Sequence, residues 1–282
     1  MPIQGADPDS LDNRDEAMVA TVCGVLEKLV VPYFRARVRG VERPPAGAAL
    51  FVGNHNAGLL APEARLFGAA MYRAHGIAGM PYFLAGDLAV TIEATRRVFL
   101  PLGAVRARPG NAERLLARGS PVFVYPGGDL ESMRAYRDRD RIVFGGRRGY
   151  VRLALRAGVP VVPVVTAGAH ATCIVLDDGS RFVMALRIDR VLRISTWPVT
   201  LCLPWGLLVG PHLVHFPWPT RILQEILEPI RFDRSGAAAA ADDAYVQACA
   251  AQVEETMQAA LTRLAAERVA PRDDRRLPGD GA

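Results

Sequence analysis

Short apolar runs alternate with helix-like stretches through the middle of the chain, and this alternation constrains the fold more than any other feature. The apolar runs fall at residues 48–52, 82–85, 121–125 and 159–165, and the last of them is rich in β-branched residues. Stretches with helical character lie between them, at residues 62–75, 111–118 and 147–157. Buried strands separated by helices are typical of βαβ units, in which neighbouring strands run parallel. We therefore expect an α/β domain with a mostly parallel β-sheet flanked by helices.

Two further helices are expected outside this alternation. Residues 16–34 place apolar side chains at helical spacing and are followed by Arg35, Arg37 and Arg39. An amphipathic helix that ends in arginines suits either a membrane surface or the packing of a core, and the sequence leaves both open. Residues 242–268 predict a terminal helix that begins at two aspartates.

The domain boundaries follow from these elements. We expect a flexible tail over residues 1–14, one α/β domain over 15–234, and a linker with the terminal helix over 235–268. The residues from 269 to 282 carry many charges and are expected to be disordered.

Composition narrows the function classes. The chain has 282 residues, half of them hydrophobic, which excludes a wholly disordered chain. Its net charge is +5, and Lys28 is the only lysine, so nearly all basic residues are arginine. This bias reflects either codon usage or attraction to phosphates and anionic headgroups. Nucleic acid is not an expected partner, because the arginines are scattered and do not alternate with stacking aromatics.

Residues 196–219 break the α/β pattern. The segment is apolar and has no formal charge, and it contains Pro198, Pro204, Pro211, Pro217 and Pro219 together with Trp197, Trp205 and Trp218. Prolines at this density exclude a straight membrane-spanning helix, while tryptophans favour the membrane interface. We interpret the segment as membrane-facing or as lining for an acyl chain; the alternative is an irregular core loop.

The cysteines indicate a reducing compartment. Cys23, Cys173, Cys202 and Cys249 all lie in apolar surroundings, and none belongs to a Cys-x-x-Cys pair. We expect buried free thiols rather than disulfides or a metal site. The polar, acidic N-terminus also lacks a secretory signal. These features predict a peripheral or monotopic protein on the cytoplasmic side of the cell membrane.

The strongest candidate for chemistry is His55, which follows Asn54 at the end of the predicted strand 48–52. Functional groups gather at the carboxyl ends of parallel strands, and a histidine there can act as a general base. Glu63 is the nearest downstream carboxylate. One helix through residues 55–63 would separate the two side chains, but Gly58 and Pro62 favour a loop that brings them together. Alternatively, Glu63 only complements the positive end of its own helix.

Two more segments carry candidate ligand-binding residues. Arg106 and Arg108 precede a predicted helix and could bind a phosphate. The turn at residues 126–128, Pro-Gly-Gly, follows the strand 121–125 and is followed by Glu131; its glycines allow close approach of the backbone to a ligand. Among the remaining histidines, His170 could line the cleft, while His212 and His215 are expected at an interface.

Taken in order, four blocks between residues 33 and 170 resemble the glycerolipid acyltransferase superfamily. They are Asn54-His55, Gly103 with Arg108, Pro126-Gly127-Gly128, and the Val-Pro-x-x-Pro-Val run at 159–164. The resemblance implies an α/β fold, a lipid hydroxyl as acceptor and an acyl thioester, of coenzyme A or acyl carrier protein, as donor. It implies no resident cofactor, and it makes His55 and Glu63 catalytic. Asn54, Arg106, Arg108, Pro126, Gly127, Gly128 and Glu131 would bind substrate.

The departures from the family pattern concern the acidic residue and the third block. The family's acidic position falls on Leu60, so Glu63 would serve three residues later. The third block is similar to that of the diacylglycerol acyltransferase branch and of plastid esterases that acylate neutral alcohols. It lacks the arginine thought to hold an acceptor's phosphate in the phospholipid branch; Arg134 is the available substitute.

The resemblance implies that His55 deprotonates the acceptor hydroxyl, which then attacks the thioester, with backbone N–H groups stabilising the oxyanion. The chain has no Gly-x-Ser-x-Gly elbow, dinucleotide fingerprint or P-loop. Two alternatives remain: a non-catalytic lipid-binding protein of the same fold, and an acyl thioesterase. A separation of His55 and Glu63 beyond about 6 Å, well outside hydrogen-bond reach, would favour the non-catalytic protein.

Overall fold

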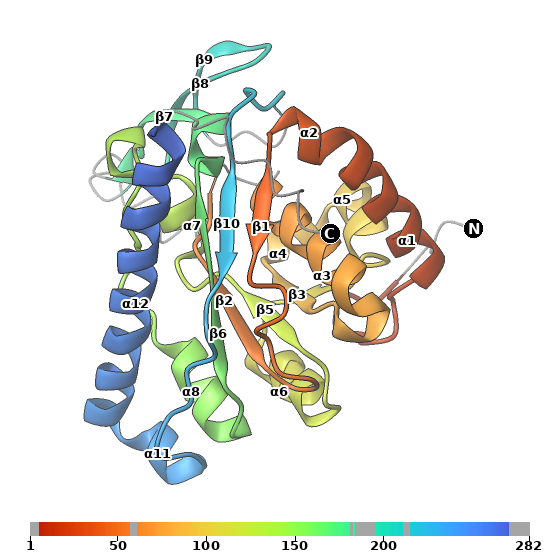
Figure 1. Ribbon diagram of the computed structural model, residues 1–282, viewed down its shortest axis with the longest axis vertical. Coiled ribbons are helices and arrows are strands. Elements are labelled where there is room, and N and C mark those ends of the chain that lie inside the picture. The colour runs from red at the N-terminus through yellow and green to blue at the C-terminus, as the bar shows by residue number, and fades with distance from the viewer. Residues whose placement is uncertain (1–5, 57–60, 181–182, 184–195, 211–214, 271–282) are drawn as a thin grey trace, which may run out of the picture.

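The computed structural model describes residues 6–56, 61–180, 183, 196–210 and 215–270. Its main feature is a seven-stranded sheet with the order β1-β10-β6-β2-β5-β3-β4 (Figure 1). The strands are β1 (Arg37–Arg39), β2 (Leu50–Gly53), β3 (Tyr82–Ala85), β4 (Ala104–Arg106), β5 (Val122–Val124), β6 (Val161–Ala167) and β10 (Leu223–Ile226). From β6 to β4 every pair is parallel. β10 pairs antiparallel with β6, and the edge strand β1 pairs parallel with β10, so these two strands run opposite to the other five. The prediction of a mostly parallel sheet is confirmed.

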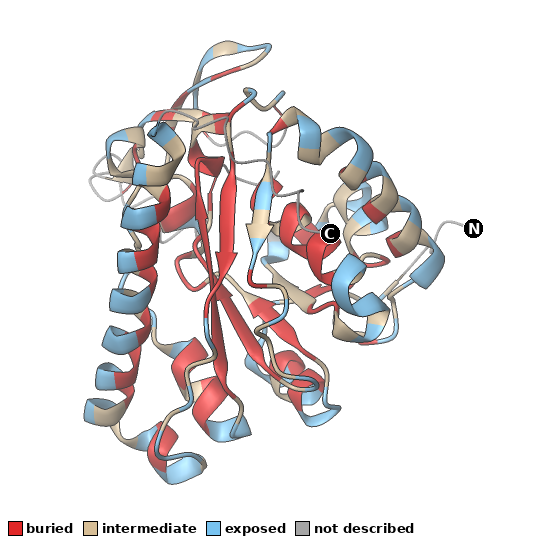
Figure 2. Cartoon of the chain, viewed as in Figure 1, coloured by how far each residue is buried: buried red, intermediate tan, exposed pale blue. Residues whose placement is uncertain are grey.

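The central strands are buried because helices cover both faces of the sheet. Figure 2 shows β2, β5 and β6 inside the molecule, and every residue of β2 and β6 is buried. Alternate side chains of β2 enter different layers, as the strand period of two requires. Leu50 and Val52 pack with the helices α6, α8, α11 and α12, whereas Phe51 packs with Phe67 and Met71 of α3.

The predicted helices are all present, with bounds shifted by a few residues. They are α3 (Pro62–Gly79), α6 (Pro109–Ala117), α8 (Gly149–Ala157) and α12 (Asp243–Val269). The N-terminal helix is continuous but irregular: α1 (Glu16–Val25) passes through a π-helical turn, η1 (Leu26–Val30), into the short α2 (Val31–Tyr33). Val19, Cys23 and Leu26 pack this helix onto α3, so one of its faces belongs to the core. The sequence did not predict α4 (Asp87–Thr91), α5 (Glu93–Phe99) or α7 (Gly128–Ser132).

The predicted linker and the N-terminal segment are both more ordered than expected. The predicted linker contains a short helix, α11 (Ala237–Ala241), because alanine has the highest helix propensity and Ala239 and Ala240 are buried against the core. Residues 6–14 are packed rather than flexible: Leu11 is buried, and the Arg14 guanidinium lies 3.5 Å from the centre of the Tyr82 ring. Residues 1–5 and 271–282 of the expected tails lie outside the described part of the chain.

The segment 196–219 forms part of a second, antiparallel sheet. Its strands are β7 (Ile174–Asp177), β8 (Val199–Cys202) and β9 (Gly206–Val209), and β8 and β9 form a hairpin that projects from one end of the molecule (Figure 1). Residues 211–214, including His212, lie outside the described residues. The four cysteines are free and buried, as predicted. Among the described helices, none is both long and apolar enough to cross a membrane.

Candidate active site

His55 lies just beyond the carboxyl end of β2, at the edge of the sheet where the parallel strands end. Its Nδ1 atom is 3.0 Å from Oε1 of Glu63, whose side chain is buried in the first turn of α3. Pro62 occupies the start of that helix, and the preceding residue, Ala61, is left-handed with φ of 34°. The two side chains therefore meet although eight positions separate them along the chain. Residues 57–60, between them, lie outside the described part.

The hydrogen bonds around Glu63 fix which imidazole nitrogen can act as a base. The Asn56 N–H lies 2.8 Å from Glu63 Oε1 and 3.1 Å from His55 Nδ1. We assign it to the carboxylate, since a charged acceptor makes the stronger bond. Nδ1 then carries a proton and donates it to the same oxygen. The lone pair of His55 Nε2 has no partner among the described residues, and the His55 side chain is 18% exposed.

An aromatic side chain holds the imidazole ring from one face. The Tyr125 ring stacks on the His55 ring at 4.2 Å between centroids, with an angle of 12° between the planes. Burial raises the pKa of Tyr125 well above its ordinary value, and Glu63 and Glu131 raise it further. Nothing in the sequence predicted this contact, beyond the place of Tyr125 at the end of a predicted strand.

Glu131 holds the backbone of His55. Its Oε2 accepts the N–H of His55 at 2.9 Å, and its Oε1 accepts the N–H of Val143 at 3.1 Å. The side chain is fully buried; burial raises its pKa to about 7, against the opposing effects of Arg134 and of these two hydrogen bonds. Glu131 was expected to bind substrate, but in the structure it positions the main chain of the histidine.

The glycine turn before α7 serves this arrangement. A Cβ on Gly127 would come within 2.4 Å of the Glu131 Cβ and 2.5 Å of the Val143 carbonyl oxygen. Gly128 has φ of 52°, and a Cβ there would lie 2.6 Å from Arg147 Nη1. Gly127 and Gly128 were predicted to let a ligand approach the backbone. In the structure, the protein's own atoms fill the space beside both glycines, and Pro126 is buried.

Arg134 is a buried crosslink and not a free phosphate-binding group. All five of its N–H groups are used. Its acceptors are the carbonyl oxygens of His55, Glu131, Asp138 and Arg139 and the side-chain oxygen of Asn56. Only 3% of the residue is exposed. A phosphate could bind Arg134 only by displacing one of these acceptors, so the structure does not support Arg134 as the substitute for the family's phosphate-binding arginine.

Asn54 joins neighbouring strands. Its amide nitrogen donates to the Thr166 carbonyl oxygen at 2.9 Å, and its amide oxygen accepts the Thr166 N–H at 2.8 Å. The Gln224 amide extends the network, donating to the Thr166 hydroxyl and to the Glu63 carbonyl oxygen. These bonds tie the end of β2 to β6, β10 and α3, so Asn54, expected to bind substrate, instead fixes the position of the next residue, His55.

Arg106 and Arg108 are not brought next to His55. Arg106 is the last residue of the edge strand β4, and Arg108 follows it. In the sheet, β5 and β3 lie between β2 and β4. Arg106 pairs with Asp87 at 3.1 Å and with Asp9 at 3.4 Å, and Arg108 pairs with Asp9 at 3.4 Å. Asp9 belongs to the N-terminal segment expected to be flexible, so these pairs help to hold that segment on the domain. A role of the two arginines toward a phosphate remains a prediction.

Two buried or half-buried side chains complete the surroundings. His170 Nε2 lies 2.6 Å from the Arg134 carbonyl oxygen. Burial, with Arg134 nearby, lowers the His170 pKa to about 3, so this histidine is neutral and structural rather than part of an open cleft. The half-buried Arg65 lies near Glu63 and Tyr125, over the Phe99 ring at 5.9 Å, and makes no ion pair within the described residues. The sequence reasoning missed Arg65.

Comparisons with known proteins indicate what kind of domain this is. Residues 35–167 match the family model "Acyltransferase", which covers the strands and helices that carry the site. Uncharacterized proteins of Mycobacterium tuberculosis and Mycobacterium leprae are 32% identical over 84% of this chain. The chain spans 63% and 62% of the length of these relatives.

The structure also resembles a solved one. A 1-acyl-sn-glycerophosphate (LPA) acyltransferase from Thermotoga maritima aligns with a TM-score of 0.51 and 17% identity, over 87% of this chain and 79% of that one. At this identity the likeness concerns the fold. The family match therefore identifies residues 35–167 as an acyltransferase domain, the kind of domain that carries the His55–Glu63 pair at the carboxyl edge of its sheet here.

Proposed function

We propose that the protein is an O-acyltransferase that moves a fatty acyl group from a thioester to a hydroxyl of a glycerolipid or another lipid alcohol. The observation that carries the proposal is the 3.0 Å contact between His55 Nδ1 and Glu63 at a strand end, on a histidine side chain that is 18% exposed. A separation beyond about 6 Å would have favoured a non-catalytic protein of the same fold. The observed distance supports a working acid–base pair.

The chemistry requires one base and no covalent enzyme intermediate. His55 Nε2 takes the proton of the acceptor hydroxyl while the hydroxyl oxygen attacks the thioester carbon. The C–S bond then breaks, and the thiolate leaves with the proton that His55 returns. Glu63 holds the ring through Nδ1 and stabilises the positive charge that the imidazole gains. The donor is an acyl thioester of coenzyme A or acyl carrier protein, and the protein needs no resident cofactor.

The acceptor class depends on what surrounds His55. The structurally similar Thermotoga maritima protein is a 1-acyl-sn-glycerophosphate acyltransferase, and its acceptor carries a phosphate. In this chain every N–H group of Arg134 donates to an acceptor in the protein, and Glu131 occupies the space beside the glycine turn that precedes α7. These contacts favour a neutral lipid alcohol. A lipid acceptor places the enzyme at a membrane surface, and four buried free thiols are consistent with the cytoplasmic side.

The test is an acyl-transfer assay on two variants with the same panel of acceptors: lysophosphatidate, diacylglycerol and a long-chain alcohol. His55→Ala should lower the rate by on the order of 10³- to 10⁴-fold, because the base is removed. Glu63→Gln should lower it by about 10²-fold, because the ring loses its charged partner but keeps Nε2. Arg118→Gln, an exposed residue on another face of the domain, is the control.

Two results would contradict the proposal. One is transfer that continues at the original rate in His55→Ala. The other is release of free fatty acid, at an unchanged rate, whether or not an acceptor alcohol is present; this result would identify a thioesterase that uses the same base with water.

A further inference from the structure

The β8–β9 hairpin presents apolar side chains to solvent. In its register Leu201 lies opposite Leu207, and Val199 lies opposite Val209, so all four share one face. Leu201, Leu207 and Val209 are 38%, 61% and 69% exposed. The opposite face, turned to the protein, carries the buried Thr200. An antiparallel ribbon with one covered face normally points its polar residues outward, and here the outward face is apolar.

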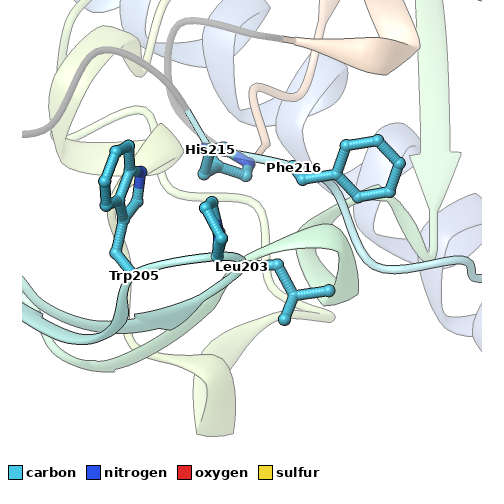
Figure 3. A pocket seen from close by; sticks show the side chains of 5 residues that line it. Leu203, Trp205, His215 and Phe216 are labelled. Carbon is cyan, nitrogen blue, oxygen red and sulfur yellow. The ribbon is translucent and has the colours of Figure 1, made fainter.

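The apolar surface continues around the tip of the hairpin. Trp205 is 59% exposed and Phe216 is 57% exposed. They flank an open notch of about 470 Å³, lined by Leu203, Pro204, Trp205, His215 and Phe216. Figure 3 shows the Trp205 and Phe216 rings on either side of this notch, with His215 between them. Contiguous exposed apolar surface of this kind marks an interaction site.

The hairpin lies at the end of the molecule that holds the candidate active site. In Figure 1 it projects beyond the end of the sheet from which α7 starts, which is the edge where β2 and β5 finish. The N-terminal helix reaches the same end, where the Tyr33 ring meets the Phe216 ring at 6.0 Å between centroids. One turn before Tyr33, Leu29 is 66% exposed and adds to the apolar surface.

Cations border this surface. Lys28, Arg35 and Arg37 lie in the N-terminal helix or directly after it, all three are exposed, and none forms an ion pair with another described residue. The next arginine along β1, Arg39, points to Glu267 and pairs with it. Most of the chain's other arginines on the described surface are likewise paired with carboxylates, so the unpaired charge near the hairpin is available to a negatively charged partner.

We propose that the β8–β9 hairpin, with Phe216, inserts into the interfacial layer of an anionic lipid bilayer, and that Lys28, Arg35 and Arg37 bind the headgroups around it. Apolar side chains ringed by unpaired cations fit a membrane whose surface is negative and whose interior is apolar. A protein partner fits less well, because residues 196–219 carry no charge with which to specify one. The inference deepens the proposed function, since it fixes the side from which a lipid acceptor reaches His55.

The experiment is co-sedimentation of the full chain with vesicles of phosphatidylcholine alone and of phosphatidylcholine with phosphatidylglycerol. The double variant Leu207→Ser/Val209→Ser should bind both kinds of vesicle at least about tenfold more weakly than wild type. Val98→Ser, which changes an exposed valine on α5, is the matched control and should change binding less than about twofold.

The same co-sedimentation assay tests the role of the cations. Arg35→Gln and Arg37→Gln should each weaken binding about fivefold on the anionic vesicles and leave binding to pure phosphatidylcholine unchanged. Arg231→Gln is the control, because Arg231 is exposed and unpaired among the described residues but follows β10 toward the opposite end of the sheet. Brominated lipids should quench wild-type tryptophan fluorescence, and Trp205→Phe should remove most of that quenching while the protein still binds.

Three outcomes overturn the inference: equal vesicle binding by wild type and the double variant, quenching that persists in Trp205→Phe, or wild type that ignores vesicles and instead forms a dimer that the double variant abolishes. The last outcome would assign the surface to a second copy of the chain. Because sedimentation does not depend on catalysis, a chain that binds vesicles but transfers no acyl group contradicts the proposed function alone, and an active chain that ignores vesicles contradicts the insertion alone.

Discussion

The corner around His55 and the β8–β9 hairpin depart from the usual distribution of side chains in opposite ways. The corner buries charged groups, including Glu63, Glu131 and Arg134, whereas the hairpin exposes Leu207 and Val209. The corner offsets the cost of burial with hydrogen bonds inside the protein: Arg134 uses every donor, and both oxygens of Glu131 accept N–H groups. The hairpin has no such compensation within the described residues. The comparison indicates that the protein itself satisfies most of the corner's polar groups, although Glu63 Oε2 has no hydrogen-bond partner among the described residues, whereas nothing described covers the apolar face of the hairpin.

The largest expected effect comes from the removal of Arg134, the cation at the centre of the corner around His55. Arg134→Met should lower the free energy of unfolding by about 3–5 kcal/mol, because it removes the cation beside the buried Glu131 carboxyl and leaves several buried carbonyl oxygens without their hydrogen-bond donor. Urea denaturation followed by circular dichroism measures the change. Arg118→Met, which breaks a salt bridge between exposed side chains, should cost less than about 1 kcal/mol. Equal losses in the two variants would mean that the corner is not held by Arg134.

A second, somewhat smaller effect comes from the proton on Glu131. The folded chain keeps this proton up to about pH 7, whereas an unfolded chain releases it near the ordinary value of 4.5. Between these values the folded state binds more protons, so the contribution of Glu131 to the free energy of unfolding is fully present below about pH 4.5 and is lost as the pH rises through about 7.

The Glu131→Gln variant isolates this contribution. The difference in unfolding free energy, wild type minus variant, should fall by about 3 kcal/mol as the pH is raised from 4 to 8, in addition to a constant offset for the altered hydrogen bonds. Denaturation midpoints of both proteins across that range measure it. A difference that does not vary with pH would show that Glu131 is ionised throughout.

The smallest expected effect lies in the hairpin. Leu207→Ser/Val209→Ser should change the free energy of unfolding in water by less than about 0.5 kcal/mol, because the two side chains are exposed and lose little packing. The same urea titration measures it, and the variant should also aggregate less on concentration. A loss above about 2 kcal/mol would mean that these side chains are part of the core and that the hairpin is not a free surface.

The sequence predicted the parallel sheet because strands covered on both faces are continuously apolar, and such runs are readable without tertiary information. It missed β1 and β4, which are three residues long and partly exposed, and it missed β10, which is buried but contains Gln224 and Glu225. It also missed the short helices α4, α5 and α7. The run of alanines at 237–241 was interpreted as a linker because its composition is simple, although the same residues form a helix once α8 lies beside them.

Within the site, the sequence could predict His55 and its partner Glu63 but not the roles of their neighbours. Glu131 and Asn54 were expected to face a ligand, since both follow strand ends, where ligands usually bind. The structure turns them toward the backbone of His55 and toward Thr166. A polar residue at a strand end can either bind a ligand or hold a neighbouring catalytic residue in position. The spacing of residues along the chain does not tell which of these two roles a given residue has.

The order of apolar and polar residues therefore determined the layers of this protein and the strand end that carries the histidine, because burial of whole strands is written in local composition. Tertiary structure alone decided which carboxylate meets the imidazole, that all five donors of Arg134 are spent on the protein, and that the apolar face of the hairpin points to solvent. Each of these depends on groups that come from distant parts of the chain and meet only when the sheet and its helices are assembled.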